Sequence, residues 1–260
     1  MHPVQTFTPI AWPYPRWIAH RGAGKFAPEN TLAAFRLGAS LGYQMFECDA
    51  KLSADGMVFL MHDTTLERTT DGQGVAGEWF WPALSLLDAG RWHSSQFLGE
   101  PVPTLAHVAR FCLSHGYRLN IEIKPSPGTE AATGEAVARL AAQLWQGAAV
   151  PPLLTSFQPT ALAAAQHTAA HLPRGLLVDA LWDGWLDNAR ALDCTAVVAH
   201  HSLWNITTVV QVHNAGMRCL SYTVNDEVTA QHLLTLGTDG IITDRLDLFN
   251  PKGRHRPTTR

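Results

Sequence analysis

The sequence predicts a (β/α)8 barrel, and three observations carry this prediction. Short apolar runs rich in β-branched residues alternate with Ala- and Leu-rich amphipathic stretches along most of the 260-residue chain. About seven or eight such alternations suit a barrel better than the runner-up, a doubly wound sheet. The first apolar run is not followed by a proper GxGxxG, which further weakens the doubly wound, dinucleotide-binding alternative.

Nine apolar runs are the candidate strands, in chain order 16–22, 43–52, 57–63, 117–124, 152–157, 175–179, 196–201, 218–225 and 240–244. Amphipathic stretches between most of them predict helices at 30–41, 129–146, 159–170, 184–192, 205–214 and 227–236. Asn30, Thr129 and Asn225 stand at helix starts and are candidate N-caps, because their side-chain oxygens can accept a first-turn N–H. The barrel domain is therefore expected to span 16–249.

The segment 64–104 interrupts this alternation because it is rich in turn residues and has no clear crossover helix. A loop of this length in a compact fold is usually functional or disordered, so we expect an insertion that caps one barrel mouth. Residues 1–15 are expected to form an N-terminal extension, and 250–260 a basic tail.

Bulk composition excludes several classes of protein. A formal net charge of −3 argues against a protein that coats nucleic acid or an anionic membrane. No apolar stretch approaches the roughly 20 residues of a membrane span, and the N-terminus lacks the basic region of a secretory signal. We therefore expect a cytoplasmic enzyme without stable membrane insertion. The scattered cysteines, without a CxxC pair, are expected to be reduced, buried thiols: Cys48, Cys112, Cys194 and Cys219.

Two expected strands carry a polar face, although barrel interiors are normally filled by branched apolar side chains. Because side chains alternate along a strand, each polar face is continuous: Glu47, Asp49 and Lys51 on one strand, and Asn120, Glu122 and Lys124 on the other. The outward faces must be apolar to meet the helices, so the polar faces are predicted to point inward.

Carboxylates brought together inside the barrel need a cation. Two of them ~4 Å apart repel by roughly 4 kcal/mol at an effective dielectric constant of 20. A hard divalent ion, Mg²⁺ or Ca²⁺, held by Glu47, Asp49 and Glu122 would offset this repulsion. The alternative is that Lys51 and Lys124 neutralise the acids as structural ion pairs.

Two histidines, His20 and His62, each follow an apolar run and are expected at the same barrel mouth as the acids. Taken singly, each would more often be a structural histidine. Taken together, their near-neutral pKa suits a pair that moves one proton in and one out. Arg21 follows His20 where the strand ends and would meet an anion, with Gly22 and Gly24 letting the backbone approach it.

The ordered motifs resemble those of the glycerophosphodiester phosphodiesterases, specifically the cytoplasmic bacterial type. They run over about 17–249: "HRG" (20–22), "PENT" (28–31), "ECD" (47–49), "DG" (55–56), "HD" (62–63), "LERTTDG" (66–72), "NIEIK" (120–124), "TVN" (223–225) and "GTDGIITD" (237–244). The resemblance implies a TIM barrel with a small inserted subdomain, in an enzyme of glycerol and lipid metabolism. It implies hydrolysis of glycerophosphodiesters, such as glycerophosphocholine or glycerophosphoethanolamine, to sn-glycerol 3-phosphate and an alcohol.

The resemblance also implies roles by position. Glu47, Asp49 and Glu122 match the family's metal ligands, His20 and His62 its acid–base pair, and Arg21 and Lys124 its phosphate-contacting residues. Tyr222 departs from the Trp that often precedes "TVN", so altered packing of the headgroup or glycerol is expected. The nucleophile stays open between the substrate's own glycerol hydroxyl, giving a cyclic phosphate, and metal-bound water.

Two rival functions and one specificity hypothesis remain. The rivals are a phospholipase-like or lysophospholipase D enzyme of the same fold and a non-catalytic module that binds phosphate esters. Aromatic side chains of the insertion would contact a choline-like headgroup, or would simply pack the insertion against the barrel: Trp79, Phe80, Trp81 and Trp92.

Overall fold

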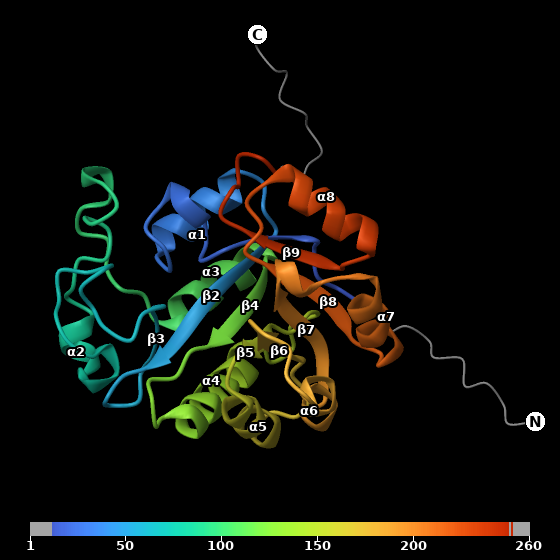
Figure 1. Ribbon diagram of the computed structural model, residues 1–260. Helices are drawn as coiled ribbons and strands as arrows, with labels where there is room; N and C mark the ends of the chain where they lie inside the picture. Colours follow the sequence, from blue (N-terminus) through green and yellow to red (C-terminus); the bar gives the residue numbers. More distant parts are fainter. Residues whose placement is uncertain (1–11, 250, 252–260) are drawn as a thin grey trace, which may run out of the picture.

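A closed parallel barrel forms the centre of the computed structural model, which describes residues 12–249 and 251 (Figure 1). The strand order is β1-β9-β8-β7-β6-β5-β4-β2, and β1 also pairs with β2, which closes the ring. Its strands are β1 (Trp17–Ala19), β2 (Met45–Leu52), β4 (Arg118–Ile123), β5 (Leu153–Ser156), β6 (Arg174–Val178), β7 (Cys194–His200), β8 (Arg218–Tyr222) and β9 (Gly240–Thr243). The predicted TIM barrel is confirmed.

Helices between the strands surround the barrel (Figure 1). They are α1 (Leu32–Ser40), α3 (Leu105–His115), α4 (Glu130–Leu144), α5 (Pro159–Thr168), α6 (Trp185–Ala191), α7 (Ile206–Asn214) and α8 (Glu227–Leu236), with the short η1 (Gly24–Phe26) and η4 (His201–Leu203). Helix α3 is an addition to the helices expected from the sequence. Thr104 caps its start, Gly116 ends it in a left-handed conformation, and its buried face follows helical spacing. Within 12–249, no helix is both long and apolar enough to cross a membrane.

Strand β3 (Val58–Leu60) lies outside the barrel and pairs antiparallel with β2. The apolar run before His62 does form a strand, but this strand is antiparallel to β2 and is not one of the barrel strands. An apolar run does not encode strand direction, which long-range pairing decides. The last two residues of β2, Lys51 and Leu52, extend beyond the part that pairs with β4. Strand β3 pairs with this end of β2 and runs back along it until Leu60 lies opposite Ala50. His62 thus still reaches the mouth.

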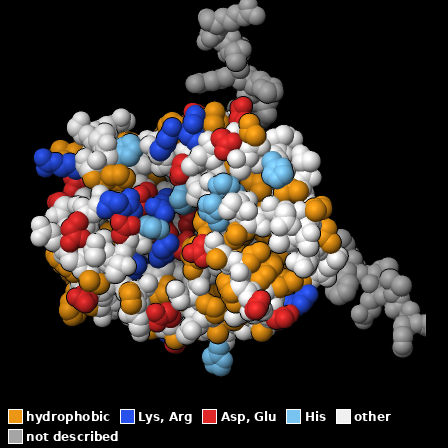
Figure 2. Space-filling model, in the orientation of Figure 1, with side chains coloured by type: hydrophobic (Ala, Val, Ile, Leu, Met, Phe, Trp, Pro, Cys, Tyr) orange, Lys and Arg blue, Asp and Glu red, His pale blue; other side chains and the backbone are white. Residues whose placement is uncertain are grey.

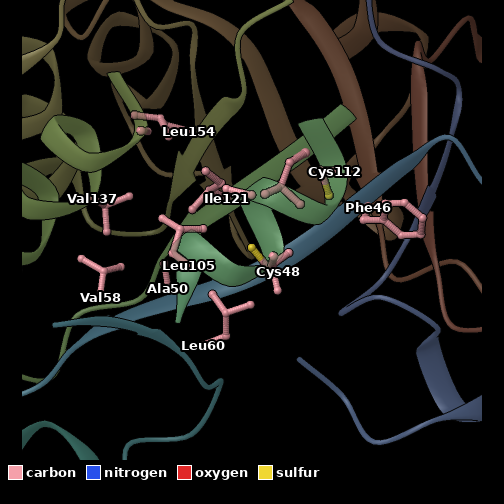
Figure 3. Packing of buried hydrophobic residues seen from close by; sticks show 14 of the residues in the cluster. Phe46, Cys48, Ala50, Val58, Leu60, Leu105, Cys112, Ile121, Val137 and Leu154 are labelled. Carbon is pink, nitrogen blue, oxygen red and sulfur yellow. The ribbon is translucent and has the colours of Figure 1, made fainter. Parts of the chain in front are cut away.

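The two faces of the barrel strands differ as predicted. Outward side chains such as Cys48 and Ile121 pack with Leu105 of α3 in one buried cluster (Figure 3). Inside, the end of the barrel at which the strands begin is apolar, and it contains Ile18, Met45, Leu153, Leu220 and Ile242 with Tyr14 beneath. The polar faces of β2 and β4 lie above this apolar cluster, which supports them from below.

The segment 64–104 forms a lobe beside β3 (Figure 1). It contains η2 (Ala76–Glu78), the four-residue α2 (Trp81–Leu84) and η3 (Ser95–Phe97), joined by turns. A separate buried cluster that includes Leu66, Leu84 and Val102 holds it against Phe59 and Met61. The lobe is therefore packed onto the barrel rather than extended into solvent.

Most of the predicted extension and tail lie outside the described residues. All four cysteines are buried and free, as expected. Two predicted helix caps are wrong by one residue, since Thr31 and Asp226 are the N-caps. Asn30 and Asn225 instead use their side chains at the mouth of the barrel, as described below.

Candidate active site

Three carboxylates meet at the mouth of the barrel to which the parallel strands point. Glu47 and Asp49 stand on β2, and Glu122 stands on β4 directly opposite Asp49 in the parallel register. One oxygen of each lies within 4.8 Å of the others. All three side chains are buried, as the inward-facing pattern predicted. Acidic side chains are visible in a hollow that basic and histidine side chains surround (Figure 2).

The charges of this cluster are unbalanced without an added cation. Burial and the charges of Asp49 and Glu122 raise the pKa of Glu47 well above its ordinary value. Burial and the charge of Asp49 raise the pKa of Glu122 to about 7. Burial acts in the same direction on Asp49, but Arg21 and Lys124 lower its pKa. Oε1 of Glu47 is buried without a hydrogen-bond partner. An unpartnered buried oxygen beside two more carboxylates suits a hard divalent cation.

Only one of the two lysines that could neutralise the acids forms ion pairs with them. Lys124 Nζ lies 2.7 Å from Glu122 Oε1 and 3.6 Å from Asp49 Oδ1, so it pairs with the acids. Lys51 is buried, and its Nζ donates a 3.0 Å hydrogen bond to the carbonyl of Lys124. Burial lowers the pKa of Lys51 to about 8. Neither lysine contacts Glu47 at ion-pair distance in the described structure, so that acid still lacks a cation of its own.

His20 is held by a carboxylate on the opposite side of its ring from the acids. Its Nδ1 lies 2.6 Å from Asp244 Oδ1, and its Nε2 lies 3.8 Å from Glu47 Oε2. Asn225 fixes Asp244 by donating to its Oδ2 and accepting from its backbone N–H. Because an ionised carboxylate only accepts, Nδ1 carries the proton and Nε2 faces the acid cluster.

His62 is likewise held through Nδ1 by a carboxylate. Its Nδ1 lies 2.7 Å from Asp63 Oδ1. Burial, with the nearby Arg21 and Lys124, lowers the pKa of His62 below its ordinary value, although Asp49 acts in the opposite direction. Both predicted histidines therefore lie near the acid cluster, His20 at 3.8 Å from Glu47 and His62 close enough to Asp49 for that charge to affect its pKa, and each is oriented through Nδ1 by a carboxylate.

The loop after β1 is strained where it meets the acids. Arg21 has a φ of 49°, and its backbone N–H donates to Glu47 Oε2 at 2.9 Å. Its guanidinium contacts Glu29 at 2.8 Å and Asp49 at 3.2 Å. Asn30, also at positive φ, donates to Asp49 Oδ2 and accepts from the Asp49 backbone N–H. This loop thereby orients two of the three predicted metal ligands.

The glycines of the same loop do a different task from the one expected. A Cβ at Gly24 would lie 2.3 Å from the Asp244 Cα, and one at Gly22 would lie 2.9 Å from the Ala34 Cβ. These glycines let the loop pack closely against the chain after β9 and against α1. The expectation that they open the backbone to the anion is therefore replaced by a packing role.

Several residues that support the site received no role in it from the sequence. They all stand inside the motifs that carry the family resemblance: Glu29, Asn30, Asp63, Arg68, Asn225 and Asp244. Only Asp63 is adjacent in the sequence to a predicted site residue, His62, so for the others their place in these motifs was the available signal. Their partners lie up to 224 residues away along the chain, as for His20 and Asp244, so spacing alone does not reveal the pairs.

Two of the four candidate aromatic side chains of the lobe pack against its core, and the other two are exposed. Trp79 and Trp81 lie partly buried against the lobe's own cluster, whereas Phe80 is 64% exposed. Trp92 is exposed and donates its Nε1–H to the carbonyl of Ala89. A small pocket beside His62 is lined by residues such as Glu29, Thr69 and Val102 and by none of these four rings. This placement favours the packing interpretation over a headgroup cage.

A second group of potential ligands, His213, Cys219 and Asp239, lies at the opposite mouth, where the strands begin. Asp239 is already engaged, because its carboxylate accepts from His213 Nε2 at 2.9 Å and from the Cys219 backbone N–H at 2.8 Å. Arg218 lies 3.0 Å from its other oxygen. This group therefore links α7 to the strands as a structural network.

Comparison with known proteins agrees with this geometry. The model of the "Glycerophosphoryl diester phosphodiesterase family" matches residues 20–248. A glycerophosphodiester phosphodiesterase of Caldanaerobacter subterraneus subsp. tengcongensis is 32% identical, over 87% of this chain and 93% of that protein. One from Bacillus subtilis is 30% identical, over 90% of this chain and 84% of that protein.

A solved structure matches as well. It is an Oleispira antarctica phosphodiesterase in complex with the product sn-glycerol-3-phosphate, with a TM-score of 0.85 and 35% identity. The match covers 92% of this chain and 95% of that one. Because the family model spans most of the sequence and these relatives align over nearly their whole length, the chain belongs to the glycerophosphoryl diester phosphodiesterase family of enzymes.

Proposed function

We propose that the protein hydrolyses glycerophosphodiesters, such as glycerophosphocholine or glycerophosphoethanolamine, to sn-glycerol 3-phosphate and the free alcohol. The observation that carries this proposal is the convergence of three buried carboxylates and two carboxylate-oriented histidines on one barrel mouth. A binding module would need no such pair of proton-transfer groups. The related Oleispira antarctica enzyme, seen with sn-glycerol 3-phosphate, supports the substrate class.

In this proposal, Glu47, Asp49 and Glu122 hold one divalent cation, Mg²⁺ or Ca²⁺. A cation bound there supplies Lewis-acid stabilisation of negative charge on the phosphoryl oxygens. The proposal rests on the unpartnered Oε1 of Glu47 and on the raised pKa values of Glu47 and Glu122, which disfavour three bare charges together. Oxygen donors alone favour a hard ion over zinc or copper.

The histidines transfer the protons. One of His20 and His62 removes the proton from the attacking hydroxyl, and the other gives a proton to the departing alkoxide. In both rings Nδ1 is engaged by a carboxylate, so Nε2 is the nitrogen that exchanges protons. Arg21 and Lys124 add positive charge beside the phosphate, where charge accumulates in the transition state.

Purified protein incubated with a panel of glycerophosphodiesters and one divalent ion at a time tests the function. We expect release of sn-glycerol 3-phosphate from soluble glycerophosphocholine. Micellar lysophosphatidylcholine serves as the competing substrate, and preferential cleavage of it would favour the phospholipase-like alternative. A preparation of the His62→Ala variant controls for contaminating activity. Binding of the diesters without release of any product would contradict the proposal.

Metal binding should depend on pH. A divalent cation should raise the melting temperature more at about pH 8 than at about pH 5, because protons compete for carboxylates below their pKa. The pKa of Glu122 is raised to about 7 in the folded chain, above its ordinary value. The metal-free protein therefore loses stability as pH rises towards about 7, and a bound cation restores it there.

Thermal unfolding with and without added Mg²⁺ or Ca²⁺ across this pH range provides the measurement. The Glu122→Gln variant is the matched control, because it removes the titrating charge and should flatten the pH dependence. An equal melting-temperature shift at both pH values in the unmodified protein would contradict the assigned ligands.

A further inference from the structure

Arg68 of the lobe bridges two carboxylates that each support a proposed active-site residue. Its Nε and Nη2 lie 2.5 and 2.9 Å from the two oxygens of Asp63. Its Nη1 and Nη2 lie 2.8 Å from the two oxygens of Glu29. The guanidinium thus forms two parallel pairs of hydrogen bonds, the strongest geometry available to an arginine.

Asp63 transmits this contact to His62. Its Oδ1 accepts from both His62 Nδ1 and Arg68 Nη2, and its Oδ2 accepts from Arg68 Nε. Hydrogen bonds from Arg68 lower the pKa of Asp63, so the carboxylate remains ionised and only accepts. The ring of His62 is thereby held with its proton on Nδ1 and with Nε2 free for proton transfer.

Glu29 transmits the same contact to Arg21. Its Oε1 accepts from Arg21 Nη1 at 2.8 Å and from Arg68 Nη2 at 2.8 Å. Burial opposes ionisation of Glu29, but Arg68 and Arg21 lower its pKa. A single nitrogen, Nη2 of Arg68, therefore binds both the oxygen that holds His62 and the oxygen that holds Arg21.

We propose that Arg68 is a positioning residue, through which the lobe sets the proton-transfer ring of His62 and the phosphate-binding guanidinium of Arg21 relative to each other. This inference rests on the proposed function of those two residues. It assigns the segment 64–104 a part in turnover as well as in packing. Lysine cannot replace this arginine, because one ammonium nitrogen cannot span two carboxylates with parallel hydrogen bonds.

A structural ion pair is the competing interpretation, and it makes a different prediction. The Arg68 side chain is 45% exposed, its partners Glu29 and Asp63 are 13% and 26% exposed, and Glu29 keeps Arg21 as a second cation, so loss of Arg68 should cost little folding stability. A positioning role instead lowers turnover while the melting temperature hardly changes, because small misplacements of reacting groups are costly to rate.

Kinetics of the Arg68→Ala and Arg68→Lys variants on glycerophosphocholine test the proposal. We expect both variants to lose at least about tenfold in kcat with a melting temperature close to that of the unmodified protein. Arg190→Ala is the matched control, since Arg190 forms an exposed ion pair with Asp187 away from the site, and it should keep full turnover. Unchanged kcat in both Arg68 variants would overturn the proposal.

A double-variant cycle identifies the route. If Arg68 acts through Asp63, then Asp63→Asn should cost much less in the Arg68→Ala background than in the unmodified protein. If the fold-losses in kcat of the two single variants simply multiplied in the double variant, the proposed action of Arg68 through Asp63 would be contradicted.

A second readout needs no turnover. Imidazole ¹⁵N NMR should find the His62 ring with its proton on Nδ1 in the unmodified protein and in mixed tautomers in Arg68→Ala. An unchanged His62 tautomer in Arg68→Ala would overturn the inference. If the unmodified protein released no sn-glycerol 3-phosphate, the proposed function would fail, while this NMR comparison would still decide the role of Arg68.

Discussion

Replacing either His20 or His62 by alanine should lower kcat by at least about 10²-fold, because general acid and general base catalysis each contribute about that much. Each ring sits at the mouth with its Nδ1 held by a carboxylate, which leaves Nε2 as the nitrogen that would exchange the proton. Both side chains are near the surface of the mouth rather than in the apolar core, and the fold should therefore survive the change. Steady-state turnover of glycerophosphocholine, with circular dichroism as the folding check, measures the effect.

A histidine away from the mouth provides the matched control. His171 is exposed in the turn before β6, and His171→Ala should retain full turnover. A double His20→Ala, His62→Ala variant should lose less kcat than the product of the two single fold-losses, because the residues act in one reaction. Near-normal kcat in both single variants would contradict acid–base catalysis by this pair.

Removal of the divalent cation should lower turnover at least as much as replacement of either histidine. A chelator should reduce turnover by at least about 10²-fold, because Arg21 and Lys124 alone do not supply the charge of the ion. Glu122→Gln should act in the same direction at low metal concentration, since it keeps the shape of the ligand but removes its charge. In that variant Lys124 loses the charge of its partner at 2.7 Å and retains Asp49 at 3.6 Å, so the local ion pairing persists in part.

Measuring activity against metal concentration separates binding from chemistry. We expect Glu122→Gln to need much more metal for half-maximal turnover, and re-addition of metal to the chelated protein to restore activity. Glu135→Gln on the exposed face of α4 is the control, because this acid forms an ion pair with Arg139 on the same helix, away from the site. Full turnover in excess chelator would contradict the metal site.

The sequence predicted the barrel and the acid cluster for the same physical reason. Alternation along a strand is a local property, so the inward placement of Glu47, Asp49 and Glu122 follows once the helices are known to cover the other face. Their mutual closeness required the register of β2 with β4, and the parallel barrel provides it. Local pattern and long-range pairing agree at these residues.

Features that depend only on contacts between distant parts of the chain were not predicted from the sequence. The direction of β3 depends on the overhang of β2, and an apolar run of this length carries no sign of it. Asn30 has the chemistry of a helix cap, but at positive φ it binds Asp49 instead. Arg68 acts across 39 residues on Glu29 through side-chain geometry that no spacing encodes.

Glu47, Asp49 and Glu122 are proposed to share one cation beside His20 and His62, close enough to serve a single phosphate. A crystal structure with Mn²⁺ and sn-glycerol 3-phosphate, with the metal located by anomalous scattering, would show whether they do. We predict one strong anomalous peak bound by oxygens of all three acids, and a phosphate within hydrogen-bond distance of both Nε2 atoms. A metal bound elsewhere, or a phosphate that reaches only one of the two rings, would contradict the account.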